Sequence, residues 1–230
     1  MKKTILYTIL ITFVVSSCTV SKPVLKTVAY KKMYDEKPVS VLIMPPINRS
    51  TAVDAKEYFH SSLLVPLSNA GYYVIPPFLS MEILKKESAY DSELFVNAPL
   101  QKFGEIFGAD MVLFTIINKW TKSYGYVTVG VEYIIKSTKT NEILYNRKGT
   151  VNYSTNVQVN GGGLIGALVS VAATAISTAA TQYIGVARAC NSYTLSDIPL
   201  GKFAPVNPKE NEEFAGQNDF NINLNSQYSN

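Results

Sequence analysis

The sequence predicts a single α/β domain with a mixed β-sheet flanked by helices. Apolar runs of strand length alternate with helical periodicity in the first half of the domain. Three consecutive strand patterns without an intervening helix follow them. The composition, 47% hydrophobic and 17% charged, suits a chain with one hydrophobic core.

The parallel part of the sheet is predicted from two strands that flank a helix. Val39–Met44 is a nearly continuous aliphatic run, as expected of a strand buried on both faces. A proline pair ends it, because proline cannot donate to a β-ladder. A helix is expected over about Val53–Ala70, kinked at Pro66. Tyr72–Ile75 also ends at a proline pair, so the three segments predict a βαβ unit.

The antiparallel part follows two shorter helices, predicted over Leu79–Glu87 and Pro99–Phe107. Asp110–Trp120 is again almost entirely apolar and should be a central strand. Gly125–Ser137 alternates apolar and polar residues, as a half-exposed strand does, and Ile143–Thr155 returns beside it. These three strands predict an antiparallel meander joined to the parallel start.

The last part of the chain contains an uncharged segment and a polar tail. Leu164–Ala187 runs for 24 residues without a formal charge, and its small and hydroxyl residues repeat with helical spacing. This pattern predicts a long small-residue helix that packs on the domain. Its length would also suffice to span a bilayer, so membrane insertion remains an alternative, as does an irregular segment. Residues 201–230 are polar and Asn-rich, which predicts a disordered tail.

The amino-terminal residues have the pattern of a bacterial lipoprotein signal. Two lysines precede the apolar run Ile5–Val15, which is too short to cross a bilayer. Val15-Ser16-Ser17-Cys18 resembles the lipobox, in which the cysteine thiol carries diacylglycerol. Acyl chains on Cys18 would anchor the protein stably in a membrane. An ordinary secretory signal with an incidental cysteine is the alternative.

This signal divides the chain into four parts. They are a signal peptide over 1–17, a lipid-anchored tether over 18–37, the α/β domain over 38–200 and the tail over 201–230. Fully extended, the tether would reach about 60–65 Å. Thr19-Val20-Ser21 resembles neither the inner-membrane retention signal nor the surface-export signals of some lipoproteins. We therefore expect an outer-membrane protein that faces the periplasm.

Few residues are candidates for binding or chemistry. Asn48, Arg49 and Ser50 follow a parallel strand and precede a helix, where an anion or small ligand can bind, although turn formation alone would also explain them. His60 is expected on a solvated helix face, and Cys190 is expected to be a small packed residue. No spacing suggests a carboxylate pair, an activated nucleophile or a metal site, so neither catalysis, nor a metal, nor another cofactor is expected. The net charge of +4 is too small to imply nucleic acid.

Four blocks of sequence resemble a known family. They are Val41–Ser50, Pro66–Val74, Glu105–Asp110 and Gly162–Ser170, and they are similar to the bacterial lipoproteins filed as domain of unknown function 799. The resemblance implies a lipid-anchored periplasmic α/β domain, similar in outline to the amino-terminal domain of the Tol-system translocation protein. It also implies genes often found beside a curli-secretion-type lipoprotein, and no functional residue other than the acylated cysteine, here Cys18.

The hypothesis that best fits these patterns is a non-enzymatic outer-membrane lipoprotein that is a structural or interaction subunit of an envelope or secretion-type complex. It would dock through a sheet edge or through Leu164–Ala187, as a homo-oligomer or with other envelope lipoproteins. One alternative is small-ligand binding at the end of the sheet, beside Pro45-Pro46 and Pro76-Pro77. Another is a pore-associated subunit that inserts Leu164–Ala187 in the membrane.

Overall fold

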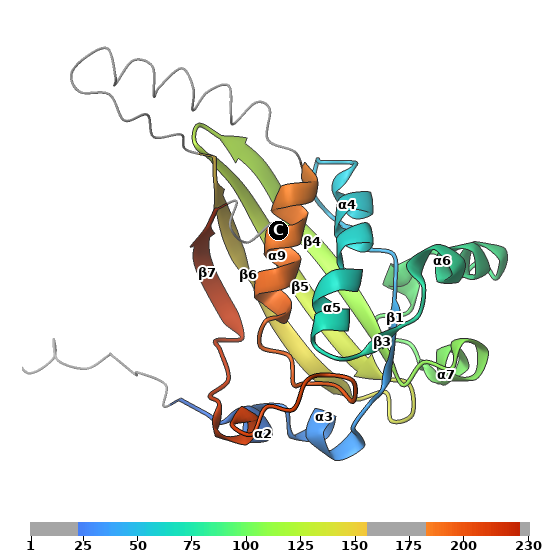
Figure 1. Ribbon diagram of the computed structural model, residues 1–230. Helices are drawn as coiled ribbons and strands as arrows, with labels where there is room; N and C mark the ends of the chain where they lie inside the picture. The colour runs from blue at the N-terminus through green and yellow to red at the C-terminus, as the bar shows by residue number, and fades with distance from the viewer. Residues whose placement is uncertain (1–22, 156–182, 226–230) are drawn as a thin grey trace, which may run out of the picture.

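A mixed β-sheet forms the centre of the structure, a computed structural model that describes residues 23–155 and 183–225 (Figure 1). In these residues the strand order is β3-β1-β4-β5-β6-β7, with the short β2 paired to β4. The strands are β1 (Ser40–Ile43), β2 (Ile47–Asn48), β3 (Tyr73–Val74), β4 (Met111–Ser123), β5 (Tyr126–Ser137), β6 (Ile143–Ser154) and β7 (Asp219–Leu224). The α/β class predicted from the sequence is confirmed.

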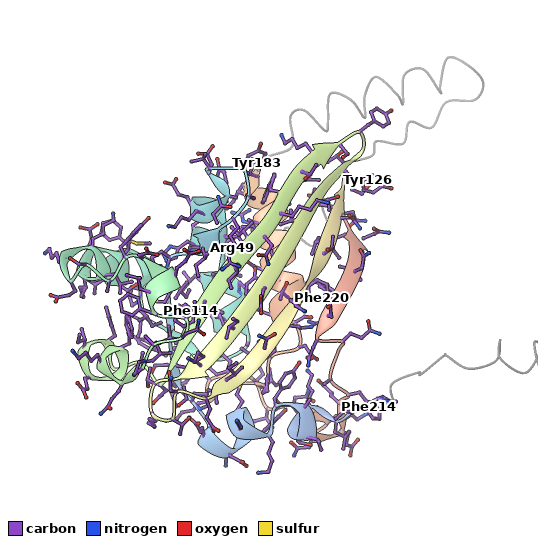
Figure 2. All side chains as sticks on the ribbon, turned by 180° about the vertical axis from the view of Figure 1, so that it is seen from behind. Arg49, Phe114, Tyr126, Tyr183, Phe214 and Phe220 are labelled. Carbon is purple, nitrogen blue, oxygen red and sulfur yellow. The ribbon has the colours of Figure 1, made fainter. Side chains whose placement is uncertain are left out.

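Helices cover the two faces of this sheet unequally. One face carries α4, α5 and α9, whereas α6 and α7 cover only the β1–β4 end of the other face (Figures 1 and 2). The helices are α2 (Lys26–Ala29), α3 (Lys31–Glu36), α4 (Ala55–Ser62), α5 (Leu64–Asn69), α6 (Pro77–Lys86), α7 (Gln101–Phe107) and α9 (Tyr183–Leu195), with 3₁₀ turns η1 (Ser92–Leu94) and η2 (Glu210–Glu212).

The predicted parallel start is confirmed. Strand β1 pairs in parallel with both β3 and β4. Val41 and Ile43 belong to the core under α4, α5 and α9, while Leu42 packs with the side chains of α6 and α7. Burial on both faces explains why this strand is a continuous aliphatic run and does not alternate.

The single kinked helix predicted over Val53–Ala70 is two helices. Helix α4 ends at Ser62 and α5 begins at Leu64. Pro66 has no backbone N–H for the carbonyl of Ser62, and its ring crowds that carbonyl. The proline therefore breaks the helix one turn before its own position.

The predicted meander is also confirmed, since β4 pairs antiparallel with β5, and β5 with β6. Val127, Val129 and Val131 point into the core, as their alternation predicted. The outer face of β5 is less exposed than expected at its end, where Lys136 is buried and donates to the carbonyl of Val96 at 3.0 Å. The loop before α7 covers this end of the strand.

The prediction of disorder over 201–230 is wrong for the part of the tail that the structure describes. Strand β7 pairs in parallel with β6, with Val151 opposite Ile222. Phe220 and Leu224 of β7 are buried in the core. In β7, apolar residues alternate with asparagines, which have a low strand propensity. The asparagines therefore mask the strand pattern in the sequence, and pairing with β6 stabilises the strand.

The prediction of a linker over 18–37 is likewise wrong from Leu25 onward. Residues 26–36 form α2 and α3, and Tyr30 and Met33 are buried in the core. An isolated antiparallel bridge joins Leu25 to Phe214. The folded domain therefore begins before residue 38 and extends past residue 200.

Residues 164–182 of the predicted small-residue helix lie outside the described residues. Its last five residues are the first turn of α9, where Val186 and Ala187 are buried. This helix continues to Leu195, past the end predicted at Ala187. In the described ranges, no helix has the length and hydropathy needed to cross a membrane.

A buried polar network joins α9 to α4 and β5. Asn191, fully buried, accepts a hydrogen bond from the Tyr133 hydroxyl. Its amide nitrogen donates to the Phe59 carbonyl at 3.0 Å and to the Ser62 hydroxyl at 2.8 Å. Every polar atom of this side chain is thus matched to a buried partner, which fixes the position of α9.

We predict that Asn191→Ala lowers the free energy of unfolding by about 3 kcal/mol, because three buried polar groups lose their partner. Urea unfolding monitored by circular dichroism measures this change. Asn146→Ala is the matched control. Asn146 lies half-buried on the other face of the sheet and donates to Glu132 at 3.3 Å, so its loss should cost less than about 0.5 kcal/mol. Equal effects of the two substitutions would contradict the role of the network.

Candidate functional site

Cys18, the predicted lipid-anchor residue, lies outside the described residues and stays a prediction. The described chain begins five residues later and leads directly into α2. The residues that hold this amino-terminal segment against the domain are therefore the first part of the candidate site.

A cluster of charged and hydroxyl side chains, here named the terminal clamp, joins the two ends of the described chain. Its members are Lys26, Tyr30, Arg147, Asp197 and Glu213. The Lys26 ammonium lies 2.8 Å from Glu213 and 3.8 Å from Asp197. Asp197 also accepts hydrogen bonds from the Tyr30 hydroxyl and, at 2.9 Å, from the backbone N–H of Gly216.

Protonation in the terminal clamp follows from burial and from these contacts. Burial, together with the hydrogen bond to Asp197, raises the pKa of Tyr30 far above its ordinary value, so the phenol remains a donor. The hydrogen bond from Lys26 lowers the pKa of Glu213. The clamp thus joins the carboxyl groups of Asp197 and Glu213 to the Lys26 ammonium and the Tyr30 phenol, with the Arg147 guanidinium beside them.

Arg147 connects the terminal clamp to the sheet. Its buried guanidinium donates to the backbone carbonyls of Gln217, Tyr193 and Thr194 at 3.0–3.2 Å. The group also lies about 5 Å from the centres of the Tyr193 and Phe220 rings. A planar, permanently charged group can satisfy several carbonyls and two rings at once, which a lysine could not do.

Gly216 lies where Arg147 and Asp197 approach each other, and a larger residue there would displace the guanidinium. A Cβ atom on Gly216 would lie 2.9 Å from the Arg147 guanidinium and 3.5 Å from the Asp197 carboxyl carbon. The segment 214–217 can pass between the two groups because it carries no side chain at this point.

The predicted ligand contacts Asn48, Arg49 and Ser50 form a turn after β2. The Asn48 side-chain oxygen accepts from the Ser50 N–H at 3.0 Å and from its hydroxyl at 2.7 Å, and its nitrogen donates to Ala52 at 2.7 Å. Asn48 and Ser50 are thus engaged within the turn. Arg49 is exposed, with its Nε 3.7 Å from Glu93. A ligand contact at this turn stays a prediction, and Arg49 is the one of the three side chains that is not engaged within the turn.

A pocket of about 290 Å³ lies at the carboxyl end of β1, where small-ligand binding was proposed as an alternative. It is lined by side chains of α4 and α6 and of the loops beside them: Pro45, Pro46, Lys56, Glu57, His60, Ser61, Met81, Lys85 and Tyr90. The ammonium groups of Lys56 and Lys85 lie 4.7 and 6.0 Å from the centre of the Tyr90 ring. The pocket therefore presents two cations and one carboxylate around an aromatic wall.

The prediction that His60 is solvated is wrong. Its Nε2 atom is buried and has no hydrogen-bond partner among the described residues. Burial is the main cause that lowers the pKa of His60. A hydrogen bond with the backbone of Ile43 raises the pKa, and the charge of nearby Lys56 lowers it. No local pattern predicts this, because His60 is off the apolar stripe of α4 and is covered by the end of β1.

A second pocket, of about 430 Å³, lies at the amino end of the sheet. Met33, Tyr34, Tyr72 and Leu200 are among the residues that line it. One oxygen of the Glu210 carboxylate accepts hydrogen bonds from the Tyr34 hydroxyl at 3.1 Å and from the Leu200 N–H at 2.7 Å. This pocket is part of the packing between the two chain ends.

Cys190 is fully buried, as predicted for a small packed residue. Burial raises the pKa of its thiol well above the ordinary value, which keeps the sulfur protonated and unreactive. In residues 23–155 and 183–225, no three His, Cys, Asp or Glu side chains gather as metal ligands would.

We predict that stability falls as the pH decreases from about 7 to 5, and that His60→Gln removes part of this slope. Because the pKa of His60 is lowered in the folded state, the unfolded chain takes up a proton first as the pH falls below about 6.5. Urea unfolding at pH 7.5, 6.0 and 5.0 measures the effect. His60 is the chain's one histidine, so no other imidazole contributes. Parallel slopes in the two proteins would show that His60 titrates normally.

Comparisons with known proteins found similar bacterial lipoproteins. One relative is Putative lipoprotein NMB1124/NMB1162 of Neisseria meningitidis serogroup B, which is 28% identical over 171 residues, 73% of this chain and 78% of the relative. The crystal structure of lipoprotein GNA1162 from Neisseria meningitidis is 27% identical, with a TM-score of 0.48 over 61% of this chain and 99% of that chain. The LpoB C-terminal domain from Salmonella enterica is 14% identical, with a TM-score of 0.38 over 55% of this chain and 94% of that domain.

A family model matches residues 28–199, about three quarters of the chain, and its description is "Putative lipoprotein GNA1162-like". This confirms the resemblance to bacterial lipoproteins, whereas the narrower label, domain of unknown function 799, stays a prediction. The chain therefore belongs to the GNA1162-like lipoprotein family.

Proposed function

We propose that this protein is a non-enzymatic lipoprotein of the outer membrane, anchored through Cys18 and facing the periplasm, where it is an interaction subunit of an envelope or secretion-type complex. Membership in a lipoprotein family and the lipobox before Cys18 support the anchor. The observation that carries the proposal is the terminal clamp, because it fixes the amino-terminal segment rigidly to the domain.

The terminal clamp shortens the distance over which the domain can move away from its anchor. Only five residues, 19–23, separate Cys18 from Val24, where the described contacts with the domain begin. Even fully extended, this stretch reaches about 20 Å, well under half the reach expected for a tether that ends at residue 37. The domain of an acylated chain would therefore work close to the membrane surface, and so would its partners.

The outer face of β5, β6 and β7 is the surface best suited to a protein partner. Figure 2 shows these strands from behind with no helix in front of them. A row of side-chain hydrogen bonds crosses the face, from Thr128 to Asn152 at 3.0 Å and from Asn152 to Asn221 at 3.1 Å. At the edge, β7 pairs only with β6 among the described strands. A second copy of this chain, or another envelope lipoprotein, such as one of the curli-secretion type, would dock on this polar face or edge.

We predict that Cys18 becomes acylated and that partners contact the outer face of the sheet. Cells fed an alkyne analogue of palmitate should label the wild-type protein but not Cys18→Ala. A photo-crosslinking residue at Asn221 should give specific adducts, identified by mass spectrometry, in the outer-membrane fraction. The same residue at Lys102, an exposed position on α7, is the matched control.

Two results would overturn the proposal. The first is an unlabelled wild-type protein, which would remove the anchor. The second is an equal adduct pattern at Asn221 and Lys102, which would remove the outer face as the docking surface. Insertion of about twelve Gly and Ser residues after Val20 should keep acylation but reduce the Asn221 adducts, because it restores a long tether.

Small-ligand binding is the second candidate function, and the pocket at the carboxyl end of β1 favours it. Open α/β sheets bind ligands at the carboxyl ends of their parallel strands, and Lys56 and Lys85 favour an anionic ligand there. The pore-associated alternative rests on residues 164–182, outside the described part of the chain.

We predict that a small anionic ligand of this pocket raises the melting temperature of the purified protein, and that Lys56→Ala with Lys85→Ala abolishes the increase. Lys139→Ala with Lys148→Ala is the control, because these lysines lie elsewhere on the surface. A thermal-shift screen of carboxylates, phosphates and sugar phosphates tests the prediction. A screen without any stabilising compound would argue against ligand binding.

A further inference from the structure

Three apolar residues, here named the anchor-side patch, lie where the amino-terminal segment joins the domain. They are Leu25, Val28 and Phe214. The antiparallel bridge pairs Leu25 with Phe214, and it is flanked by hydrogen bonds from the Lys26 N–H to the Glu213 carbonyl and from the Ala215 N–H to the Val24 carbonyl. This arrangement makes Leu25 and Phe214 a non-hydrogen-bonded pair, whose side chains lie close together on one side.

The third member extends the patch along α2. Val28 lies in the single turn of α2, three residues after Leu25, which is the N-cap residue of this turn. Val28 is 64% exposed and Phe214 is 58% exposed. Single exposed apolar residues are common on protein surfaces, but a fixed group of them marks a contact. The group is fixed here because the terminal clamp holds both strands of the bridge.

Three lysines of the amino-terminal segment are already paired. Lys26 binds Glu213, Lys31 lies 2.5 Å from Asp35, and Lys32 lies 2.8 Å from Glu142. The surroundings thus carry nearly balanced charge, which gives little attraction for a strongly charged partner. What the surface offers is apolar area with a polar rim, the chemistry of a segment that lies in the interface of a bilayer.

The position of the patch indicates which apolar partner can reach it. The chain leaves the domain at Val24, next to Leu25 of the patch, and Cys18 is at most about 20 Å of extended chain away. Figure 2 labels Phe214 beside the amino-terminal helices, at the opposite end of the molecule from Tyr126 in the β4–β5 hairpin. The lipid leaflet that holds the acyl chains is therefore the apolar medium within reach of these three side chains.

We propose that the anchor-side patch inserts into the head-group region of the leaflet that carries the Cys18 acyl chains. The inference rests on the proposed lipid anchor. The patch gives the protein a second attachment beside the acyl chains, and two attachments fix the tilt of the domain where one would leave it free to swing. The outer face of β5–β7 is then presented to its partners at a constant angle from the membrane.

The test uses the full-length acylated protein in vesicles of phosphatidylethanolamine and phosphatidylglycerol. Val28→Cys and Phe214→Cys, each labelled separately with an environment-sensitive fluorophore, should show a blue shift and quenching by nitroxide lipids labelled near the head group. The fluorophore reacts only with the introduced thiol, because Cys18 is acylated and Cys190 is buried. Val53→Cys is the matched control, an 83% exposed valine just before α4, at the other end of the molecule.

Each outcome decides between the occupants. Quenching at positions 28 and 214 but not at 53 supports the proposal. Protein that floats with the vesicles without quenching at 28 or 214 overturns the patch and leaves the anchor intact. Protein that does not float removes the anchor and this inference with it. A blue shift that lipid nitroxides do not quench, and that disappears on dilution, would instead assign the patch to a second copy of the chain.

A second variant separates insertion from simple proximity. Val28→Ser with Phe214→Ser should leave flotation unchanged, because the acyl chains suffice for binding. Energy transfer from a fluorophore at Val53→Cys to a head-group acceptor should then report a broader distance distribution than in the protein with the intact patch. An identical distribution in the two proteins would show that the patch does not set the orientation. Matching circular dichroism spectra control for folding.

Discussion

The buried carboxylate of Asp197 must be compensated, because an ionised carboxylate loses much of its favourable hydration when it is removed from water. Its compensating groups come from distant parts of the chain: the ammonium of Lys26, the hydroxyl of Tyr30 and the backbone N–H of Gly216. Arg147 lies on the other side of Gly216 and fixes the same segment through backbone carbonyls. The loss of one partner of such a buried charge typically costs about 3–5 kcal/mol, so the two chain ends are held together as one unit.

This constraint changes the meaning of the amino-terminal segment. A flexible linker would leave the domain free to explore a wide layer above the membrane, and the surfaces that face a partner would change continuously. The docked α2–α3 segment instead fixes the point at which the amino-terminal chain leaves the domain, at Val24. If Cys18 carries the proposed lipid anchor, the fold then limits how the sheet can be oriented relative to the membrane.

The two faces of the sheet differ in how they are covered. One face buries α4, α5 and α9, and the Asn191 network locks α9 in place there. The other face is closed by α6 and α7 near β1 and is open and polar over β5–β7 (Figure 2). The pocket at the carboxyl end of β1 lies between α4 and α6, which belong to opposite faces. The stable packing and the exposed polar surface are therefore on different sides of the same strands.

The features that the sequence predicted correctly are those with local physical causes. The aliphatic run of β1, the proline that ends it and the alternation in β5 each follow from a few neighbouring residues. The break before Pro66 was expected as a kink for the same reason. The lipobox before Cys18 is also a local motif, because it consists of the residues beside the cysteine, but the anchor itself stays a prediction.

The features that the sequence did not predict depend on contacts between distant residues. Lys26 and Glu213 are 187 positions apart, so no local pattern in α2 or in the Asn-rich tail predicts that they pair. The environment of His60 is likewise set by the end of β1 and not by its own helix. The sequence by itself determined strands β1, β3, β4, β5 and β6, the mixed class of the sheet and the candidate anchor. Only the tertiary structure decided that the tether and the tail are parts of the domain, because their stability comes from burial against each other and not from local propensity.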